Sequence, residues 1–220
     1  MPENGKSFLI DTTKCFACRA CQVACKQWNG LAPEEKVPTN RGTYENPPDL
    51  SHTQRCLLLF KEVERPDGTL AWNFLRHSCR HCLDAPCKQQ AEHPDSITID
   101  EQTGAVLYQE GTKNESYTRI RKACPRGIPR RGPDGRLYKC VMCVDRVHNG
   151  ELPACAKVCP SGAIQFGDRQ EMLDAAEARL AALRPDHPHA AVLDRDEARV
   201  LILLGDRESM YKMQPEAAMA

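Results

Sequence analysis

The chain has 220 residues, and its 13 cysteines are an odd number, which argues against a framework made only of disulfides. Its 30 Lys and Arg residues balance its 30 Asp and Glu residues, so charge gives no reason to expect a nucleic-acid partner. Only 5% of the residues are aromatic, against 16 prolines and 13 glycines, so metal or covalent cross-links are needed to supplement a small core.

The N-terminal residues contain no apolar segment and no twin-arginine pair, so no export signal is predicted for this chain. The longest apolar run, at 200–204, is too short to cross a bilayer, so no transmembrane segment is expected. Residues 8–13 predict a short strand that leads into the first cysteines.

Four cysteines follow that strand, Cys15, Cys18, Cys21 and Cys25, at offsets of three, three and four residues. This is the spacing by which bacterial ferredoxins bind cubane iron–sulfur clusters. The first three thiolates can surround one face of a 4Fe–4S cube, and the fourth characteristically binds a second cube. The run therefore predicts that cysteines from distant parts of the chain complete two clusters.

The segment after this run, residues 28–50, is irregular because it is rich in Pro, Asn and Gly. Residues 55–63 and 69–74 predict a hairpin around a Pro-Asp-Gly turn. Cys56 lies in the first hairpin strand, away in sequence from every group of thiols. It is predicted to be a small buried apolar residue rather than a ligand.

Further elements follow. Short strands are predicted at 96–100, 105–108, 161–167 and 199–204, and the last few residues are expected to fray. Residues 169–183 predict an amphipathic helix that has Asp168 as its N-cap. Its apolar face carries Leu173, Ala176, Leu180 and Leu183.

The other cysteines repeat parts of the first run. They are Cys79, Cys82 and Cys87, then Cys124 before a proline, then Cys140 and Cys143, and finally Cys155 and Cys159. In a two-cluster module, each run gives three cysteines to one cube and its last cysteine to the other. This rule predicts three ligand sets: Cys15, Cys18, Cys21 and Cys159; Cys25, Cys140, Cys143 and Cys155; Cys79, Cys82, Cys87 and Cys124.

A fourth cluster is predicted to be absent. By the same spacing rule its ligands would stand at Ala91, Asn114, Tyr117 and Ile120, none of which can replace a thiolate. All four losses belong to one cube, whereas the other cube of that pair keeps every ligand. Twelve ligands and Cys56 together account for the 13 cysteines, so three 4Fe–4S clusters are predicted.

Other interpretations of the cysteines remain open. Structural zinc also uses paired cysteines, although it does not explain a three-thiol run with a distant fourth ligand. His77, His81 and His93 lie near the second group, where one could bind a cluster or serve beside it or at the surface. If Cys124 lies away from Cys79 in space, a three-iron cluster becomes the alternative there.

Residues 119–139 are strongly basic. They contain Arg119, Arg121, Lys122, Arg126, Arg130, Arg131, Arg136 and Lys139 against a single acid, Asp134. This segment is either a solvated face or a set of cations that offsets the negative charge of clusters or docks a partner subunit.

Three motifs carry a family resemblance. They are Cys-x2-Cys-x-Ala-Cys-Gln-Val-Ala-Cys-x2-Trp-Asn at 15–29, Tyr-Lys-Cys-x2-Cys-Val-Asp-Arg-Val at 138–147, and Pro-Ala-Cys-x-Lys-x-Cys-Pro-x-Gly-Ala-Ile-x-Phe-Gly at 153–167. Together they resemble the iron–sulfur (beta) subunit of membrane-bound formate dehydrogenases. The broader family includes electron-transfer subunits of dimethyl sulfoxide, nitrate and polysulfide reductases, which normally carry four clusters. One missing cluster and no C-terminal membrane helix make this chain similar to the small subunit of soluble two-subunit tungsten or molybdenum formate dehydrogenases.

The resemblance implies an electron-transfer subunit that is not catalytic by itself. Its heterodimer partner would hold a bis-pterin tungsten or molybdenum site and a further cluster, and a multihaem cytochrome c would accept the electrons. Export with the partner would place the pair in the periplasm, with the cytoplasm as the alternative. Two other functions remain as hypotheses, an iron–sulfur subunit of a sulfoxide or sulfur-oxyanion reductase and a zinc-stapled structural protein.

The expected fold is a loop-rich α+β arrangement of two interleaved ferredoxin-like modules. Residues 1–74 and 138–170 would form a discontinuous module with two clusters and the hairpin. Residues 75–137 would form an inserted module with one cluster, and residues 171–220 a C-terminal helix and strand extension. The cluster at Cys79 is expected to be the exit of the electron path, since its module has lost the next cube.

Overall fold

The computed structural model describes residues 4–33, 44–65 and 67–215. In chain order its elements are β1 (Lys6–Asp11), α1 (Ala20–Trp28), β2 (Cys56–Glu64), β3 (Leu70–Ser78), α2 (Pro86–Gln89), β4 (Ile97–Ile99), β5 (Val106–Tyr108), η1 (Glu110–Asn114), α3 (Tyr117–Ala123), β6 (Arg130–Arg131), β7 (Leu137–Tyr138), α4 (Val144–His148), α5 (Ala154–Lys157), β8 (Ile164–Asp168), α6 (Arg169–Leu183), β9 (Ala191–Leu193), β10 (Val200–Leu204) and η2 (Glu208–Met210). The predicted mixture of helices and strands is confirmed. The predicted fraying of the last residues concerns 216–220, which lie outside the described residues.

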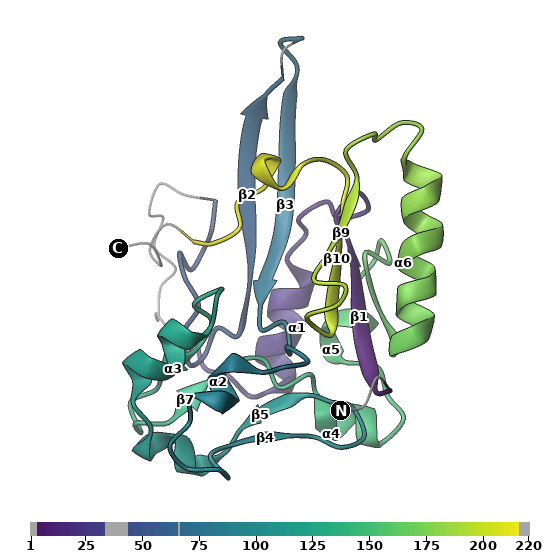
Figure 1. Ribbon diagram of the computed structural model, residues 1–220. Coiled ribbons are helices and arrows are strands. Elements are labelled where there is room, and N and C mark those ends of the chain that lie inside the picture. The colour runs from purple at the N-terminus through teal and green to yellow at the C-terminus, as the bar shows by residue number, and fades with distance from the viewer. Residues whose placement is uncertain (1–3, 34–43, 66, 216–220) are drawn as a thin grey trace.

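A four-stranded sheet in the order β8-β1-β10-β9 forms one side of the molecule (Figure 1). The strand β1 pairs in parallel with β10 and antiparallel with β8, so the two ends of the chain are joined in one sheet. Alternate side chains of β1 point to opposite faces, with Leu9 in the core under α6 and Phe8 and Ile10 in the main core. The predicted strands at 8–13, 161–167 and 199–204 are confirmed, with shifted ends.

The helix α6 covers the outer face of this sheet, as Figure 1 shows. It begins and ends where the sequence predicts, and Asp168 caps it in a capping box with Glu171. Its four predicted apolar residues pack with Leu9, Leu201 and Leu203. This prediction is confirmed in its bounds, cap and buried face.

The long β2–β3 hairpin stands apart from the sheet and pairs residue for residue from Cys56↔Ser78 to Glu64↔Leu70 (Figure 1). It confirms the predicted hairpin, with the first strand shifted by one residue and the second extended to Ser78. One face carries Leu57, Leu59 and Leu75 into the main core. The other face includes Leu58 and Arg76, which line a hollow beside the first cysteines. The base of the hairpin therefore lies among the predicted ligands.

A lower layer is built from α2, α3 and the two-stranded pairs β4–β5 and β6–β7 (Figure 1). The predicted strands at 96–100 and 105–108 are confirmed by β4 and β5. This layer has its own small core of Ala85, Ile97, Val106, Ile120 and Leu137. The segment expected to form an inserted module thus contains its own apolar cluster.

The C-terminal segment contacts both the four-stranded sheet and the second cysteine group. Its strand β10 is an inner strand of the sheet, and the residues just before it contact the second cysteine group. The Leu83 amide donates to the Glu197 carbonyl at 2.8 Å, and Cys82 forms an isolated bridge with Ala198. Within the described ranges, no helix has the length and apolar character that crossing a membrane requires.

Candidate metal centres

Two of the three predicted ligand sets each line a hollow. Cys79, Cys82, Cys87 and Cys124 line one, and Cys15, Cys18, Cys21 and Cys159 line the other. The volumes of the two hollows, including the part that is open to solvent, are about 430 and 480 Å³. In both cases thiols from distant parts of the chain face one common space. The condition for a three-iron cluster at the second group, Cys124 lying away from Cys79, is therefore not met.

The remaining set, Cys25, Cys140, Cys143 and Cys155, lies in the interior, and all four side chains are buried. Burial raises the pKa of Cys25, Cys143 and Cys155, and the charge of Cys140 adds to the rise at each, so Cys140 is their shared neighbour. The helices α1 and α5, which carry Cys25 and Cys155, pack against each other. The chain therefore brings these four thiols together as well.

The Cys-x-x-Cys loops at Cys15–Cys18, Cys79–Cys82 and Cys140–Cys143 share one backbone turn. The residue two positions after the first cysteine has a left-handed backbone in every case: Ala17 (φ 61°), His81 (φ 50°) and Met142 (φ 59°). The amides of His81 and Met142 donate to the Sγ atoms of Cys79 and Cys140, both at 3.4 Å. A residue other than glycine rarely has a left-handed backbone, so its recurrence at the same position of three loops indicates a shared function. Such turns direct backbone amide groups toward a bound anion. A cluster bound by thiolates is negatively charged, so these turns suit it.

The cysteine that follows each of these three loops is the second residue of a helix. Cys21 stands there in α1, Cys87 in α2 and Cys155 in α5. In the first turn of a helix the backbone amides have no intrahelical acceptor and favour a negative charge. The three sites thus repeat one local design. These three helices were not predicted, although the proline that opens α2 is a sequence sign of a helix start.

Burial and crowding change the acidity of the thiols. Burial, followed by the charges of Cys79 and Cys124, raises the pKa of Cys82 to about 12. Burial also raises the pKa of Cys143 to about 11 and that of Cys155 to about 12. Buried thiols stay protonated unless a positive charge stabilises the thiolate form. The iron of a bound cluster supplies that positive charge. The arrangement therefore suits an iron–sulfur group.

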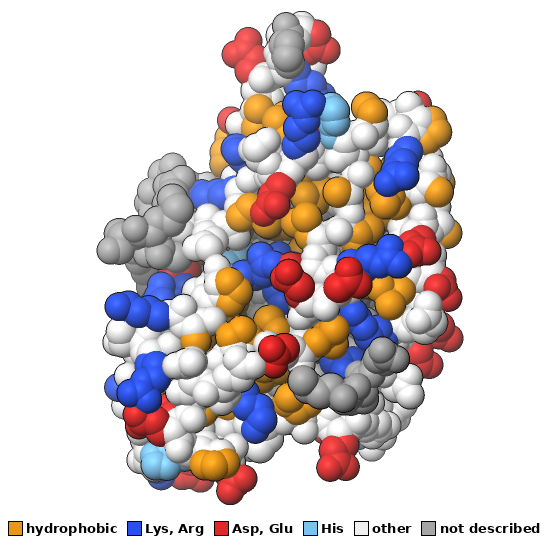
Figure 2. Space-filling model, in the orientation of Figure 1, with side chains coloured by type: hydrophobic (Ala, Val, Ile, Leu, Met, Phe, Trp, Pro, Cys, Tyr) orange, Lys and Arg blue, Asp and Glu red, His pale blue; other side chains and the backbone are white. Residues whose placement is uncertain are grey.

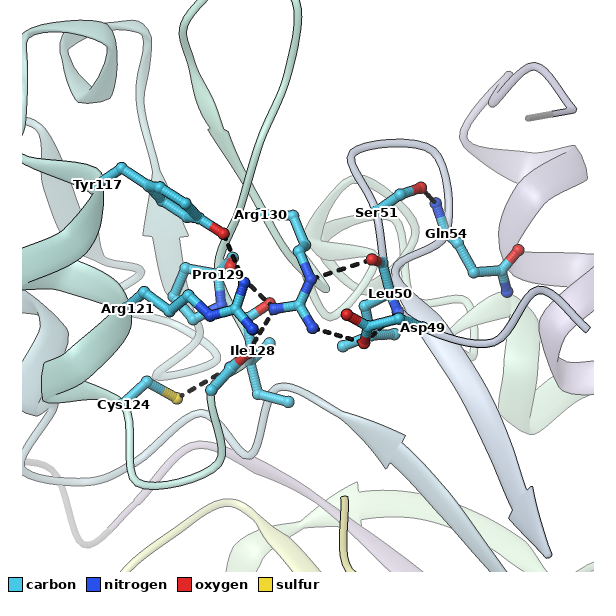
Figure 3. A network of polar contacts seen from close by, with 11 residues as sticks. Asp49, Leu50, Ser51, Gln54, Tyr117, Arg121, Cys124, Ile128, Pro129 and Arg130 are labelled. Carbon is cyan, nitrogen blue, oxygen red and sulfur yellow. Dashed lines mark hydrogen bonds and ion pairs between the residues drawn. The ribbon is translucent and has the colours of Figure 1, made fainter. Parts of the chain in front are cut away.

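The loop after Cys124 is held by a single buried arginine, Arg130 (Figure 3). Arg130 donates to the carbonyls of Ile128 and Pro129 at 3.1 and 3.0 Å, and also to that of Gly127. On its other side it reaches the Leu50 carbonyl at 3.0 Å and Asp49 Oδ1 at 2.5 Å. The loop so shaped lets the Ile128 amide donate to Cys124 Sγ at 3.5 Å. Arg130 thus fixes the fourth thiol of this site.

Replacing Arg130 with methionine is expected to remove the cluster of this site selectively. Breaking a buried ion pair and its hydrogen bonds costs about 3 kcal/mol, which frees the Cys124 loop. Iron content should fall by about four atoms per chain. The control is Arg119→Met in the same basic segment, because Arg119 and its partner Glu92 are both half-exposed and their pairing is worth under about 1 kcal/mol. Equal iron content in the two variants would contradict this role.

The basic segment divides into an inner and an outer part. Lys139 is buried and donates to the Cys140 carbonyl at 3.0 Å, and its charge lowers the pKa of Cys79 and Cys87 against the larger effect of burial. Arg126 forms an ion pair with Asp194, which also lies 3.5 Å from the buried Arg80. Arg119 and Lys122 are exposed, and on the face in Figure 2 Lys and Arg side chains are scattered among acids. The exposed residues form a solvated face, whereas the role of the buried cations in offsetting cluster charge stays a prediction.

The three histidines of this region have different surroundings. His93 is exposed. His81 is buried and accepts the Val106 amide on Nδ1 at 3.1 Å. His77 is buried, and burial together with nearby arginines lowers its pKa to about 3. None of the three lines the hollow that contains Cys79 and Cys124.

Cys56 is fully buried, as predicted, but it is not isolated in space. It lies beside Cys21. A hydrogen bond with Cys21 lowers the pKa of Cys56, and the charge of Arg76 lowers it further. Arg76 is the main residue that the sequence did not single out. It is buried and lies beside Cys155 and the hollow that contains Cys21, on a strand, β3, whose register is set by its pairing with β2.

Comparison with known proteins identifies the chemistry. A family described as "4Fe-4S dicluster domain" matches residues 70–169. The matched region includes the second and third cysteine groups.

Relatives of nearly the same length are also known. The chain is 42% identical to "Formate dehydrogenase subunit beta" of Megalodesulfovibrio gigas, over 94% of this chain and 97% of that one. It is 41% identical to "Formate dehydrogenase 2 subunit beta (cytochrome c-553)" of Nitratidesulfovibrio vulgaris, over 94% and 96%. A nitrate-inducible formate dehydrogenase iron–sulfur subunit of Escherichia coli is 42% identical over 84% of this chain and 62% of its own length.

Proposed function

Because this chain belongs to the family of formate dehydrogenase iron–sulfur (beta) subunits, we propose that it conducts electrons through three 4Fe–4S clusters. Its electron-transfer role in formate oxidation and its 4Fe–4S chemistry follow from the family. The number of clusters, their ligands and their order are the proposal. The observation that carries it is the threefold repeat of one thiol-binding design, with a left-handed loop and a helix start in each copy.

Three clusters, and not four, fit the packing of the lower layer. Of the four positions where a further cube would need thiols, Ile120 is fully buried in the small core of that layer. Ala91 and Tyr117 pack against the same core. Apolar side chains thus fill the space on that side of Cys87, which supports the loss of that one cube.

The order proposed for the path is the Cys15 site, then the Cys25 site, then the Cys79 site. The Cys25 set is buried, whereas Cys18 is exposed and the other ligands of the outer sites are half-buried. Cys155 of the middle set acts on the pKa of Cys21, and Cys140 acts on that of Cys79. The buried set therefore neighbours both others, which supports its place as the relay between two ends that reach the surface.

Family membership implies a catalytic partner subunit. We propose that this partner holds a bis-pterin tungsten or molybdenum site and a further cluster, and that the two chains form a heterodimer. The acceptor proposed is a multihaem cytochrome c, and the name of the Nitratidesulfovibrio relative, which includes cytochrome c-553, supports a haem protein in that role. A periplasmic location, reached together with the partner, completes the proposal.

The test is to purify the complex anaerobically and to measure formate oxidation with a dye and with a cytochrome c. We expect formate to reduce iron–sulfur clusters of this chain that are visible by electron paramagnetic resonance (EPR). A complex that reduces a sulfoxide or a sulfur oxyanion but is inert to formate would favour the reductase alternative. Zinc in place of iron, without visible absorption, would refute electron transfer altogether.

The Cys56→Ala variant is expected to keep all three clusters. Cys56 is buried beside Cys21, yet Cys21 already completes its own set, so Cys56 is not needed as a ligand. Iron should stay at about twelve atoms per chain. The matched variant Cys21→Ala, with the same side-chain change, should lose about four. Loss of about four irons from Cys56→Ala would instead make Cys56 a ligand.

A further inference from the structure

Arg76 is a cation buried at the junction of two proposed cluster sites. It belongs to β3 and is only 4% exposed. Its Nη2 donates to Cys155 Sγ at 3.7 Å, and its Nη1 donates to Ser78 Oγ at 2.6 Å. It also lines the hollow that contains Cys15, Cys18 and Cys21. One guanidinium therefore faces ligands of both the Cys15 site and the Cys25 site.

The charge of Arg76 is compensated by sulfur. A buried guanidinium is costly unless negative groups surround it. Among the described residues no carboxylate forms an ion pair with Arg76, and its Nε has no hydrogen-bond partner. Instead, the Arg76 guanidinium donates to Cys155 Sγ, and Arg76 lines the hollow that contains Cys15 and Cys21. The natural counter-charge of Arg76 is thus the ligand shell itself.

We propose that Arg76 sets the reduction potentials of the two clusters it joins and holds both at higher values than they would have without it. The inference rests on the ligand sets proposed above. Transfer of one electron oxidises the donor cluster and reduces the acceptor cluster, and at Arg76 no bond changes and no proton moves. The reduced form of each cluster carries one more negative charge, so a fixed cation stabilises it more than the oxidised form.

The effect is expected to be larger at the Cys25 site. Coulomb attraction is strong where water is excluded and falls with distance. Arg76 donates directly to Cys155, and the four thiols of that site are buried. The Cys79 site has its own buried cation in Lys139, which lies beside Cys140 and acts on Cys79 and Cys87. The Cys79 cluster therefore serves as an internal reference.

The experiment is a potentiometric titration of the anaerobic complex, with the clusters followed by EPR. Arg76→Met removes the charge and keeps the length of the side chain. At a fixed potential it should lower the reduced-to-oxidised ratio of the Cys25 cluster about tenfold, which is about 59 mV for a one-electron couple. The Cys15 cluster should shift in the same direction by less, and the Cys79 cluster should not shift. Arg76→Lys, which keeps the charge, should restore most of the potential.

The control is Arg65→Met, which removes an exposed cation from the outer end of the same hairpin and should leave all three potentials unchanged. If Arg76→Met does not retain its clusters, Arg76→Gln keeps a hydrogen-bonding group for Ser78 and carries the same expectation. Unchanged potentials in a charge-removing variant that has full iron content would overturn the inference and leave the proposed function intact. A shift in Arg76→Lys as large as in Arg76→Met would also overturn it. Wild-type protein without three clusters would instead refute the proposed function.

Discussion

Formate is expected to reduce the Cys15 and Cys25 clusters of a Cys124→Ala variant, while electron delivery to the external cytochrome falls close to background. Cys124 lines the hollow of the Cys79 site, and its loop is fastened by Arg130 and by the Ile128 amide. Without this thiol the proposed exit cluster loses its fourth ligand, so iron should fall by up to about four atoms per chain. The Cys15 and Cys25 clusters share no ligand with this site and should remain.

The measurement combines stopped-flow reduction of the cytochrome with EPR of the reduced clusters. Arg131→Met is a suitable control, because Arg131 is exposed in the same segment and is not among the residues that line the hollow. An unchanged rate of cytochrome reduction in Cys124→Ala would refute the Cys79 site as the exit.

A Cys25→Ala variant is expected to interrupt the path in the middle. Cys25 is a ligand of the buried site that neighbours both of the others. When formate is supplied, the Cys79 cluster should stay oxidised, although a strong chemical reductant should still reduce it. Removing one ligand of a buried set also leaves the remaining thiols without their counter-charge, so stability should fall by about 3 kcal/mol.

The matched variant is Cys21→Ala, one turn earlier on the same helix α1. It should remove the Cys15 cluster and spare the Cys25 cluster, so the two variants should lose different EPR signals. Reduction of the Cys79 cluster by formate at the wild-type rate in Cys25→Ala would contradict the proposed order of the path.

The sequence predicts best what is local and periodic. The helix α6 has the predicted ends and cap because a helical apolar face and an Asp168–Glu171 capping box both lie within one segment. The hairpin follows from two strands around a turn. The grouping of thiols follows from cysteine spacing, because cubane clusters need three ligands close together in sequence.

Long-range features escape such an analysis. The four-residue helices α2 and α5 are too short to form without tertiary contacts, so no periodicity predicts them. The parallel pairing of β1 with β10 joins residues almost a whole chain apart. Arg76 lies beyond the predicted strand at 69–74, and only the longer pairing of β2 with β3 brings it beside Cys155.

The central claim is that this chain holds three cubane clusters, and native mass spectrometry of the anaerobic complex tests it most directly. Dissociation of the subunits in the gas phase gives the mass of this chain with everything bound to it. We predict about twelve iron and about twelve sulfide per chain. A value near sixteen of each, near eight of each, or a mass that zinc alone explains would contradict the account.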